Sequence, residues 1–487
     1  MNRPETRNSG PELCALSARE AVRMLKQGEV SPGELLEASL QRVDQVNADV
    51  NATVIHCPER AEAAITRLHE KSAVSDHPGW LAGLTVGIKD LIDVAGLPNT
   101  CGSPALANYV PECSDPLIER LEGRGAVIGG KTNTPEFGAG ANTFNAVFGA
   151  TRNPWNTDMN AGGSSGGSAA ALATGQFWLC HGSDLAGSLR TPASFCGVVG
   201  FRPSPGRAGG GPADTAFSPE AVDGPMARDV LDAALLLDAM CGYDARQPLS
   251  LPEPEQTFQI AARQNPGSIR VAFAEDLNGF APVEMEVREV LRSAMAEVQG
   301  EGLIVEEACP MLDGLNETYL TLRGIHYGAV TDYLPQEAKR HFKRTLRENA
   351  EFGRNLTAAA IYEAMRNKTR LYQTMRGFLE QYDVLALPNT GIAPGPVEVE
   401  YPPSVDGVIM DDYVEWLKFS FLATTTGLPA LSMPAGFTSR GMPVGIQLIG
   451  PPRGEARLLQ VARALEQRLD LPSVPIDPLI GGGAGEK

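Results

Sequence analysis

Short apolar runs alternate with glycine-rich or polar turns and helical stretches over most of this chain. The first runs are Leu84 to Ile88, Ala126 to Ile128 and Phe177 to Cys180. Because alternating strands and helices pack as a sheet covered by helices, this pattern predicts an α/β fold. Three more runs lie towards the C-terminus: Val384 to Leu387, Ala430 to Met433 and Val444 to Leu448. We expect these late strands to complete the sheet from the C-terminal end.

Helix start signals dominate the first 75 residues. Ser17 with Glu20, and Ser31 with Glu34, have the spacing of capping boxes, in which a serine caps the helix and the acid returns a hydrogen bond. A third helix is expected around Arg60 to His69. Residues 1–75 are therefore predicted to form an N-terminal helical arm.

The sequence pattern becomes mostly helical between Leu303 and Tyr382. Two long charged stretches without internal proline, Gln336 to Phe352 and Ala358 to Tyr382, predict helices. We expect residues 310–382 to form a helical cap-like region of a catalytic domain that spans residues 76–480. The glycine-rich residues 481–487 are predicted to be a disordered tail.

Composition allows a large core and disfavours some partners. The chain has 487 residues, of which 43% are hydrophobic, enough for one large α/β domain with an extended sheet. The formal net charge of −18 would repel a phosphate backbone or an anionic membrane surface. We therefore expect neither nucleic acid nor a membrane as a partner.

The cysteines and the N-terminal residues indicate the cellular compartment in which the protein is expected. The eight cysteines are scattered without CxxC pairs, which fits reduced thiols. The polar first ten residues lack the apolar core of a signal peptide, and no stretch approaches the roughly 20 apolar residues of a membrane span. We expect a cytoplasmic protein that acts as a monomer or homodimer.

The most unusual segment is a glycine- and serine-rich turn that leads into an alanine-rich helix, residues 161–171 (AGGSSGGSAAA). A flexible linker would not lead directly into a strong helix former and an apolar strand. A phosphate-binding loop needs a lysine near the end of the glycine run, or a GxGxxG turn after a strand, and neither is present. A catalytic loop fits better, because glycine permits close backbone approach while the serines present hydroxyls at a helix start.

A second element of this kind follows at residues 182–193 (GSDLAGSLRTPA). Small residues precede Ser188, so successive backbone N–H groups could converge on one developing oxyanion, and Ser188 is a candidate nucleophile. His181 suggests a Ser-His-Asp triad, but no GxSxG elbow surrounds Ser188, so His181 is expected in the core or behind the site. The six histidines include no HExxH or other close metal-ligand pair.

Together the two motifs resemble those of the amidase signature family. GGSSGGSAAA, followed by SDLAGSLRTPASFCGVVGFRPS, agrees with that family's signature over a long and specific stretch. Supporting similarity lies at residues 84–90, 131–137, 151–155, 224–228, 426–430 and 442–447. The similarity covers nearly the whole chain and is weakest in the helical middle. It implies a large mixed β-sheet sandwiched between helices, and an amidase of the stand-alone type.

The resemblance also assigns roles. It implies that Ser188 is the nucleophile, Ser164 a relay serine after a cis peptide bond, and Lys89 the base. Four residues would form the oxyanion hole with their backbone: Leu185, Ala186, Gly187 and Ser188. Ser165 would support the relay serine through a hydrogen bond. Neither a metal nor a cofactor is expected.

Two positions depart from the family pattern. Ser183 stands where threonine is common and keeps the hydroxyl. Ala186 stands where the first of two glycines is common, so its methyl group changes the oxyanion loop, and a positive φ there would be strained. The departure bears on substrate range rather than on reaction type.

The chemistry requires a neutral amine at position 89. A serine hydroxyl is a poor nucleophile unless a base takes its proton, and lysine is normally protonated. Burial can lower a lysine pKa by up to about 3 to 5 units, and the apolar run before Lys89 would bury it at a strand end. Asp184 and Arg190 are expected to form an ion pair that braces the nucleophile loop rather than to act in catalysis.

Candidates for the substrate pocket are fewer. Phe144 near the relay loop, and Ile325, His326 and Tyr327 in the helical region, are candidates for an apolar wall. They favour aryl or other hydrophobic acyl groups on a small or medium amide. Because esters and carbamates share the addition step at an sp² carbonyl, cleavage of either is also expected, which would make the chain an aryl acylamidase with esterase or urethanase activity.

Two alternatives stay open. The chain could be an amidotransferase subunit that makes ammonia from glutamine for a partner acting on aminoacyl-tRNA, since that subunit belongs to the same family. Residues 134–137 (TPEF) look more like the stand-alone hydrolases. It could also be a scaffold that has lost catalysis, although it retains all three suspected catalytic residues.

Overall fold

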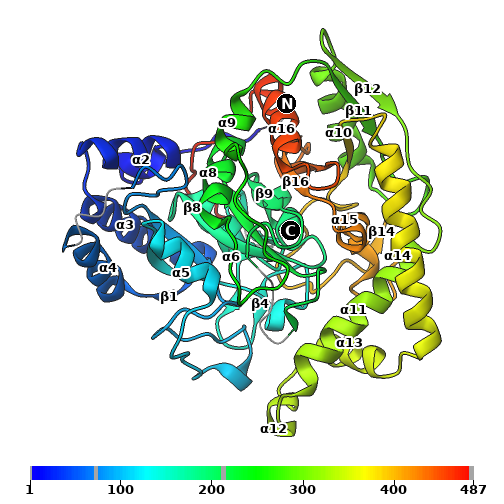
Figure 1. Cartoon of the computed structure of the whole chain (residues 1–487), viewed down its shortest axis with the longest axis horizontal. Coiled ribbons are helices and arrows are strands. Elements are labelled where there is room, and N and C mark those ends of the chain that lie inside the picture. Colours follow the sequence, from blue (N-terminus) through cyan, green and yellow to red (C-terminus); the bar gives the residue numbers. More distant parts are fainter. Residues whose placement is uncertain (1–2, 71–74, 210–214, 482–487) are drawn as a thin grey trace, which may run out of the picture.

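The computed structural model describes residues 3–70, 75–209 and 215–481, and these form an α/β structure around one large sheet. The sheet has eleven strands in the order β1-β3-β2-β8-β10-β9-β16-β17-β13-β11-β12 (Figure 1). This confirms the predicted mixed sheet between helices. The predicted tail, apart from Gly481, lies outside the described residues.

The strands of this sheet are β1 (Thr53–His56), β2 (Thr85–Lys89), β3 (Val127–Thr132), β8 (Leu179–Asp184), β9 (Val199–Arg202), β10 (Val222–Ala227), β11 (Ile269–Phe273), β12 (Leu303–Glu307), β13 (Val384–Pro388), β16 (Ala430–Phe437) and β17 (Pro443–Ile449). Short two-stranded pairs are formed by β4 (Phe144–Asn145) with β5 (Gly149–Ala150), β6 (Arg152–Asn153) with β7 (Asn156–Asn160), and β14 (Ser404–Val405) with β15 (Val408–Ile409).

The α-helices are α1 (Glu12–Ala15), α2 (Ala18–Gln27), α3 (Pro32–Val50), α4 (Pro58–Glu70), α5 (Pro116–Gly123), α6 (Gly166–Thr174), α7 (Arg190–Cys196), α8 (Val230–Met240), α9 (Phe258–Arg263), α10 (Met285–Val298), α11 (Leu315–Asp332), α12 (Gln336–Lys339), α13 (Arg344–Arg354), α14 (Ala358–Phe378), α15 (Phe421–Thr426) and α16 (Glu455–Leu469). Single 3₁₀ turns include η1 (Pro104–Leu106), η2 (Glu136–Gly138) and η4 (Glu415–Ser420).

The N-terminal helices begin where the serines predict. The Ser31 side chain accepts from the N–H of Glu34, whose carboxylate binds the N–H of Ser31 at 2.8 Å, which completes a capping box. Ser17 caps α2 through the N–H of Glu20. The N-terminal 75 residues also contain β1, which pairs antiparallel with β3 and so forms one edge of the main sheet. The division of the chain into domains stays a prediction.

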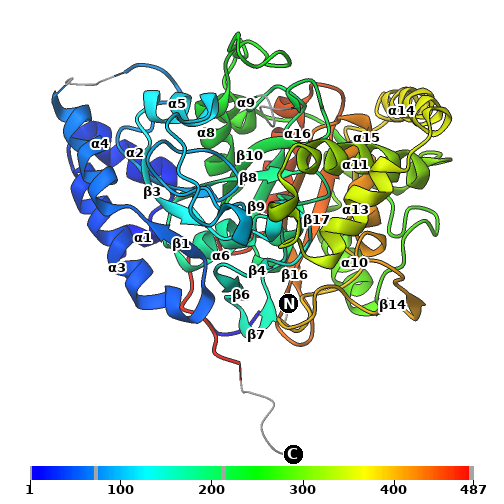
Figure 2. The ribbon, with the colours of Figure 1, turned by 90° about the horizontal axis from the view of Figure 1, so that it is seen from below.

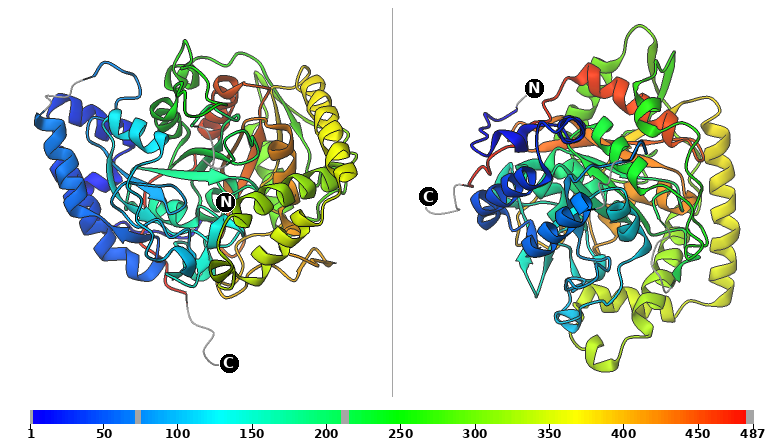
Figure 3. Two further views of the ribbon diagram at one scale, coloured as in Figure 1. Left: turned by 60° about the horizontal axis from the view of Figure 1, so that its bottom comes forward. Right: turned by 60° about the vertical axis from the view of Figure 1, so that its left-hand side comes forward.

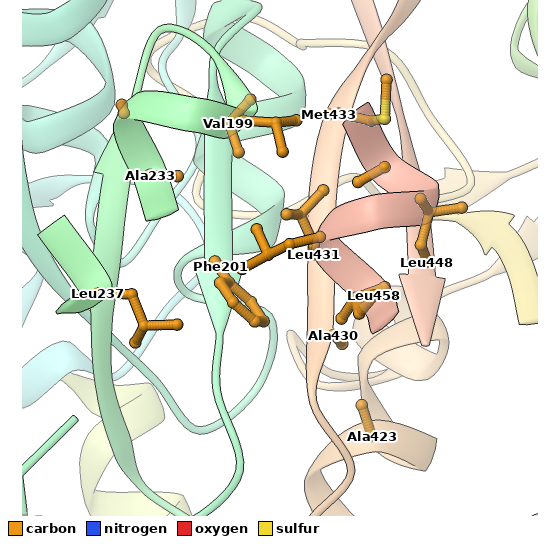
Figure 4. Packing of buried hydrophobic residues seen from close by; sticks show 14 of the residues in the cluster. Val199, Phe201, Ala233, Leu237, Ala423, Ala430, Leu431, Met433, Leu448 and Leu458 are labelled. Carbon is orange, nitrogen blue, oxygen red and sulfur yellow. The ribbon is translucent and has the colours of Figure 1, made fainter. Parts of the chain in front are cut away.

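The C-terminal strands lie inside the sheet rather than at an edge. β16 pairs with β9 on one side and β17 pairs with β13 on the other, so this hairpin joins the two parts of the sheet. Leu431 lies opposite Phe201 in the register, and both side chains are fully buried. Figure 4 shows these residues packed with Leu448 and with Leu458 of α16. The C-terminal segments are therefore needed to close the central core.

The helical region lies at one end of the molecule. α11, α13 and α14 lie on the side opposite the N-terminal helices α2 to α4 (Figures 1 and 2), and α14 runs along the outer surface in both views of Figure 3. The predicted helix over 336–352 is two helices, α12 and α13, and residues 303–307 form the edge strand β12 rather than helix. α11 and α13 cross so closely that a Cβ on Gly353 would lie 2.0 Å from the carbonyl oxygen of Gly324.

Two parallel strands bring the predicted site together. β2 pairs parallel with β8 in the register Val86 with Leu179 and Gly87 with Cys180. Lys89 ends β2 and Asp184 ends β8, so both strands deliver polar residues to the same edge of the sheet. The glycine- and serine-rich turn enters α6, which packs on both strands.

Candidate active site

Lys89 and Ser164 form the central contact of the site. The Lys89 Nζ lies 2.7 Å from the Ser164 Oγ, and both side chains are buried. The peptide bond between Gly163 and Ser164 is cis, the configuration that the resemblance implies. An amine and a hydroxyl at this distance share one hydrogen bond and can pass a proton along it.

Ser183 also holds the lysine. The Lys89 Nζ donates to the Ser183 Oγ at 3.1 Å, and the Ser183 carbonyl oxygen lies 3.4 Å away. The hydroxyl that replaces the family's threonine is therefore a direct partner of the amine. With Ser164, it fixes the lysine side chain between the glycine- and serine-rich turn and the end of β8.

The relay loop and the nucleophile loop are joined through Ser165. Its N–H donates to the carbonyl oxygen of Ser188 at 3.1 Å, and its hydroxyl contacts both the N–H and the carbonyl oxygen of Ser183 at 3.3 Å. Ser164 is thus one residue away from a backbone contact with Ser188. The sequence predicts a support role for Ser165, and these bonds are consistent with it.

The nucleophile loop turns sharply before Ser188. Gly187 has a φ of +84°, and a Cβ there would lie 3.0 Å from the Ser420 Cβ and the Thr191 Oγ1. Its N–H donates to Asp184 Oδ1 at 3.0 Å, so this group is occupied. The remaining three predicted oxyanion-hole N–H groups have no acceptor within the described part of the chain: Leu185, Ala186 and Ser188. These three are free to bind a developing negative charge.

Ala186 fits the loop without backbone strain. The only residue of the loop with positive φ is Gly187, not Ala186. The Ala186 methyl is buried in the main apolar cluster. Alanine is therefore compatible with this loop, because the glycine that follows makes the left-handed turn.

A buried ionic network lies beneath the loop. Arg190 binds both oxygens of the Asp184 carboxylate at 2.9 Å, and Arg202 approaches the same carboxylate at 3.3 Å. Burial alone would raise the pKa of Asp184, but the two guanidinium groups hold it well below its ordinary value. Arg190 also contacts the Gln447 side chain from β17. The predicted ion pair is present and fixes the loop from below.

Burial sets the protonation of the lysine. It lowers the pKa of Lys89 from 10.5 to about 7, against the opposing effect of the carboxylates of Asp184 and Asp223. A large fraction of the amine is then neutral near pH 7 to 8. This is the state that a general base requires.

Glycines in the glycine- and serine-rich turn allow neighbouring segments to pack closely against its backbone. A Cβ on Gly167 would lie 2.2 Å from the backbone nitrogen of Asn133, which no side chain could tolerate. The N–H of Gly166 donates to the Thr143 hydroxyl at 3.1 Å. The segment before Phe144 therefore holds the relay loop in place.

A cavity of about 290 Å³ lies near the relay serine. Its walls include Phe144, Glu136 and Lys343, with further lining from Gly102, Pro104, Asn145, Ala146 and His341. Glu136 begins η2, and a Cβ on Gly138 at the end of that turn would lie 3.4 Å from the Ser164 Oγ. The cavity is thus one short turn from the relay serine.

Charged groups border this cavity. The Lys343 Nζ lies 5.0 Å from the centre of the Phe144 ring and 3.0 Å from Glu400 Oε1. Burial lowers the pKa of Lys343, while Glu400 opposes the shift. The cavity therefore combines an aromatic face with the ion pair of Lys343 and Glu400.

The three candidates on α11 differ in their surroundings. Tyr327 is buried in a small apolar cluster that also contains Leu185 of the nucleophile loop. His326 packs edge-on against Tyr327, and burial lowers its pKa to about 4. The Ile325 side chain is 39% exposed. Tyr327 therefore has contacts that connect α11 to the site.

Several groups at the site were not predicted from sequence. Thr143 carries no motif, and Asp223 lies 35 residues beyond Ser188 on β10. Arg323 contributes a buried guanidinium that donates to the Asn349 side chain at 2.8 Å and to the Tyr319 hydroxyl at 3.2 Å. Only the strand register and helix packing bring these residues near the site, so no local pattern could have identified them.

Comparison with known proteins identifies the family of this chain. The family model described as Amidase matches residues 34–459. The chain belongs to the amidase family, and it is a hydrolase that acts on amide bonds.

Relatives and solved structures cover almost the whole chain. It is 34% identical over 456 residues to an acylamidase of Rhodococcus erythropolis, covering 93% of this chain and 95% of that protein. It is 31% identical over 493 residues to a glutamyl-tRNA(Gln) amidotransferase subunit of Halothermothrix orenii, covering 94% and 98%. The structure of a bacterial aryl acylamidase of the amidase signature family superposes with a TM-score of 0.85 at 27% identity, covering 94% and 98%.

A further solved structure is similar to the same extent. The substrate complex of 6-aminohexanoate cyclic dimer hydrolase superposes with a TM-score of 0.85 at 29% identity, covering 96% of this chain and all of that one. In the described ranges, none of the helices has the length and apolar character needed to cross a bilayer.

Proposed function

We propose that this chain hydrolyses the C–N bond of small or medium carboxylic amides through Ser188, Ser164 and Lys89. The observation that carries the proposal is the 2.7 Å contact between the buried Lys89 amine and the Ser164 hydroxyl, beside the loop of Ser188. The pKa of about 7 for Lys89 supports its role as base.

The first half-reaction forms an acyl-enzyme. Neutral Lys89 takes the proton of Ser164, Ser164 takes that of Ser188, and the Ser188 oxygen adds to the amide carbonyl. The reversed relay then gives the proton to the amine nitrogen, the C–N bond breaks, and the amine leaves. The free N–H groups of Leu185, Ala186 and Ser188 would bind the carbonyl oxygen as it becomes negative.

The second half-reaction releases the acid. A water molecule gives its proton to the same relay as it adds to the ester carbonyl, and the bond to Ser188 breaks when Ser188 recovers a proton. The two stages return each group to its starting protonation state. Esters and carbamates can enter the same cycle, because they present the same sp² carbonyl.

The cavity beside Phe144 supports substrates with an aryl or apolar group. Its volume of about 290 Å³ is near the lower end of ligand pockets, so it suits one ring with small substituents. An acylamidase among the relatives and an aryl acylamidase among the structures favour the same class. Phe144 would contact the ring, whereas Tyr327, with His326 and Ile325 beside it on α11, would form a wall near Leu185.

The first test replaces the nucleophile. Ser188→Ala should lower kcat for an anilide by at least about 10³-fold, because attack and acyl-enzyme formation both need this oxygen. Circular dichroism and the melting temperature should stay near wild type. Ser9→Ala, at an exposed serine far along the chain from both loops, serves as the control. Unchanged hydrolysis in Ser188→Ala would refute the mechanism.

The second test compares an anilide, an aliphatic amide and an aryl carbamate. We expect kcat/KM to be highest for an aryl-bearing substrate and to fall about tenfold or more in Phe144→Ala, with little change for the aliphatic amide. Equal loss on all three would show that Phe144 does not contact the ring.

A second candidate function is supply of ammonia from glutamine to a partner protein. The similarity to a glutamyl-tRNA(Gln) amidotransferase subunit, over 98% of the length of that protein, favours it. That function predicts preference for glutamine and co-purification with a second protein. If the chain purifies without a second protein and prefers anilides to glutamine, this function is excluded.

We keep cytoplasmic location, and a monomer or homodimer, as predictions of the main proposal.

A further inference from the structure

The carboxylate of Asp223 lies on the strand next to the proposed base. β10 pairs antiparallel with β8, and Asp223 is directly opposite Ser183 in the register (the two strands are labelled in Figure 2). Residues directly opposite one another in such a pair project to the same face of the sheet. The Ser183 Oγ is a hydrogen-bond partner of the Lys89 Nζ, so the side chain directly opposite Asp223 is also in contact with the amine.

His181 holds this carboxylate. It lies two residues before Ser183 on β8 and therefore on the same face, and its Nε2 is 2.9 Å from Asp223 Oδ1. The other ring nitrogen, Nδ1, is buried without a hydrogen-bond partner among the described residues. A doubly protonated ring would leave that second N–H donor unpaired, so the arrangement favours a neutral imidazole that donates from Nε2. Asp223 accepts this hydrogen bond.

The other carboxylate near the base has different partners. Arg190 and Arg202 both bind Asp184, whereas the Asp223 side chain has only the His181 imidazole as a hydrogen-bond partner among the described residues. Other charged groups around this part of the sheet include the ion pair of Lys131 with Asp90, 2.7 Å apart on the β3 side, and Asp115 at the start of α5, on which the charge of Arg246 also acts. Burial and then the charge of Asp223 raise the pKa of Asp115 to about 7.

We propose that Asp223, held by His181, is a positioning residue that stabilises the ammonium form of Lys89 from the neighbouring strand and so sets the pH at which the enzyme becomes active. The inference rests on the proposed function, because it takes Lys89 as the base. Burial lowers the pKa of Lys89, and the carboxylate of Asp184 and then that of Asp223 oppose the shift. Asp223 therefore helps to limit how far burial depresses the basicity of the amine.

The test is the pH dependence of kcat/KM for an anilide in Asp223→Asn, Asp223→Glu and the wild type. In Asp223→Asn the acidic limb of the kcat/KM profile should move to lower pH by on the order of half a unit. One charge interaction across a partly hydrated site has about this size. Asp223→Glu keeps the negative charge, so its acidic limb should stay nearer that of the wild type. Asp44→Asn, which removes an exposed acid from α3, should leave the limb unchanged.

A direct titration separates this inference from the proposed function. NMR of lysine labelled with ¹³C at Cε and ¹⁵N at Nζ, assigned by loss of the signal in Lys89→Met, should show Lys89 titrating at lower pH in Asp223→Asn. An unchanged limb and an unchanged titration in a folded Asp223→Asn protein would overturn the inference. If the wild type hydrolyses no substrate, the proposed function fails, and the titration still decides the effect of Asp223.

Discussion

Lys89 shows how burial alters the chemistry of one residue. The side chain is fully enclosed at the end of β2, and two serine hydroxyls take the place of water around its amine. Loss of hydration disfavours the charged form, whereas hydrogen bonds to the hydroxyls keep the amine in position. A residue that is normally a surface cation thereby becomes suited to act as a base.

Activity should therefore follow the neutral fraction of this lysine. Because the base is active when it has lost its proton, kcat/KM should rise with pH through about 7 and be about tenfold lower at pH 6 than on the plateau. A profile measured with a substrate that does not ionise checks this. A rate that falls as pH rises from 6 to 8 would contradict the assignment of Lys89.

Replacement by arginine isolates the proton transfer. Lys89→Arg keeps the positive charge and a long side chain, but the guanidinium cannot become neutral. We expect kcat to fall by at least about 10³-fold at every pH from 6 to 9, with the pH dependence of Lys89 lost. Lys26→Arg in α2, an ordinary lysine near the end of that helix, is the matched control and should behave like the wild type.

At the scale of elements, the site depends on turns that only glycine can make. Gly187 combines a φ of +84° with neighbours at 3.0 Å, and it immediately precedes Ser188, the proposed nucleophile. The loop it shapes leaves the N–H groups on either side of it unpaired within the described ranges. A small change of backbone there would move both the hydroxyl and the oxyanion donors.

Gly187→Ala should therefore reduce both stability and activity. The left-handed conformation alone costs about 1 to 2 kcal/mol with a Cβ, and the contacts with Ser420 and Thr191 add to it. We expect kcat/KM to fall at least about tenfold. Gly96→Ala, at a similar φ of +78° with no atom within 4 Å of the added Cβ, should lose stability by about 1 kcal/mol and keep its activity. Urea unfolding and initial rates measure the two effects.

At the scale of the whole molecule, the helical region and the catalytic loops meet through one small apolar cluster. Tyr327, Phe342 and Leu346 pack there with Phe137 and Leu185. Phe342 immediately precedes Lys343 of the cavity wall, and Phe137 lies within η2 beside the relay serine. We therefore expect the position of α11 and α13 to affect the shape of the cavity beside Phe144.

The crossing of α11 and α13 provides a test. Gly353→Val would force the helices apart, because a Cβ there lies 2.0 Å from the carbonyl oxygen of Gly324, and overpacking costs about 1 to 3 kcal/mol. We expect a lower melting temperature and a KM that rises more than kcat falls. Gly377→Ala in α14, where no atom lies within 4 Å, should instead stabilise the protein by about 0.5 to 1 kcal/mol.

Local sequence patterns were sufficient to predict much of this structure. The serine caps placed the starts of α2 and α3, the apolar runs located six strands to within a few residues, and the serine motifs identified the two loops. Such features depend on residues close together in the chain. The break between α12 and α13 was missed, because the segment has no proline or glycine to mark it.

The sequence by itself determined many of the elements and the residue types of the site, since turns, caps and apolar periodicity act over a few neighbours. Only the tertiary structure decided that Asp223 lies opposite Ser183, that Ser183 binds the Lys89 amine, and that a C-terminal hairpin lies in the middle of the sheet. These relations come from the pairing of strands far apart in the chain. Pairing is selected by the burial of the whole core, which no local segment specifies.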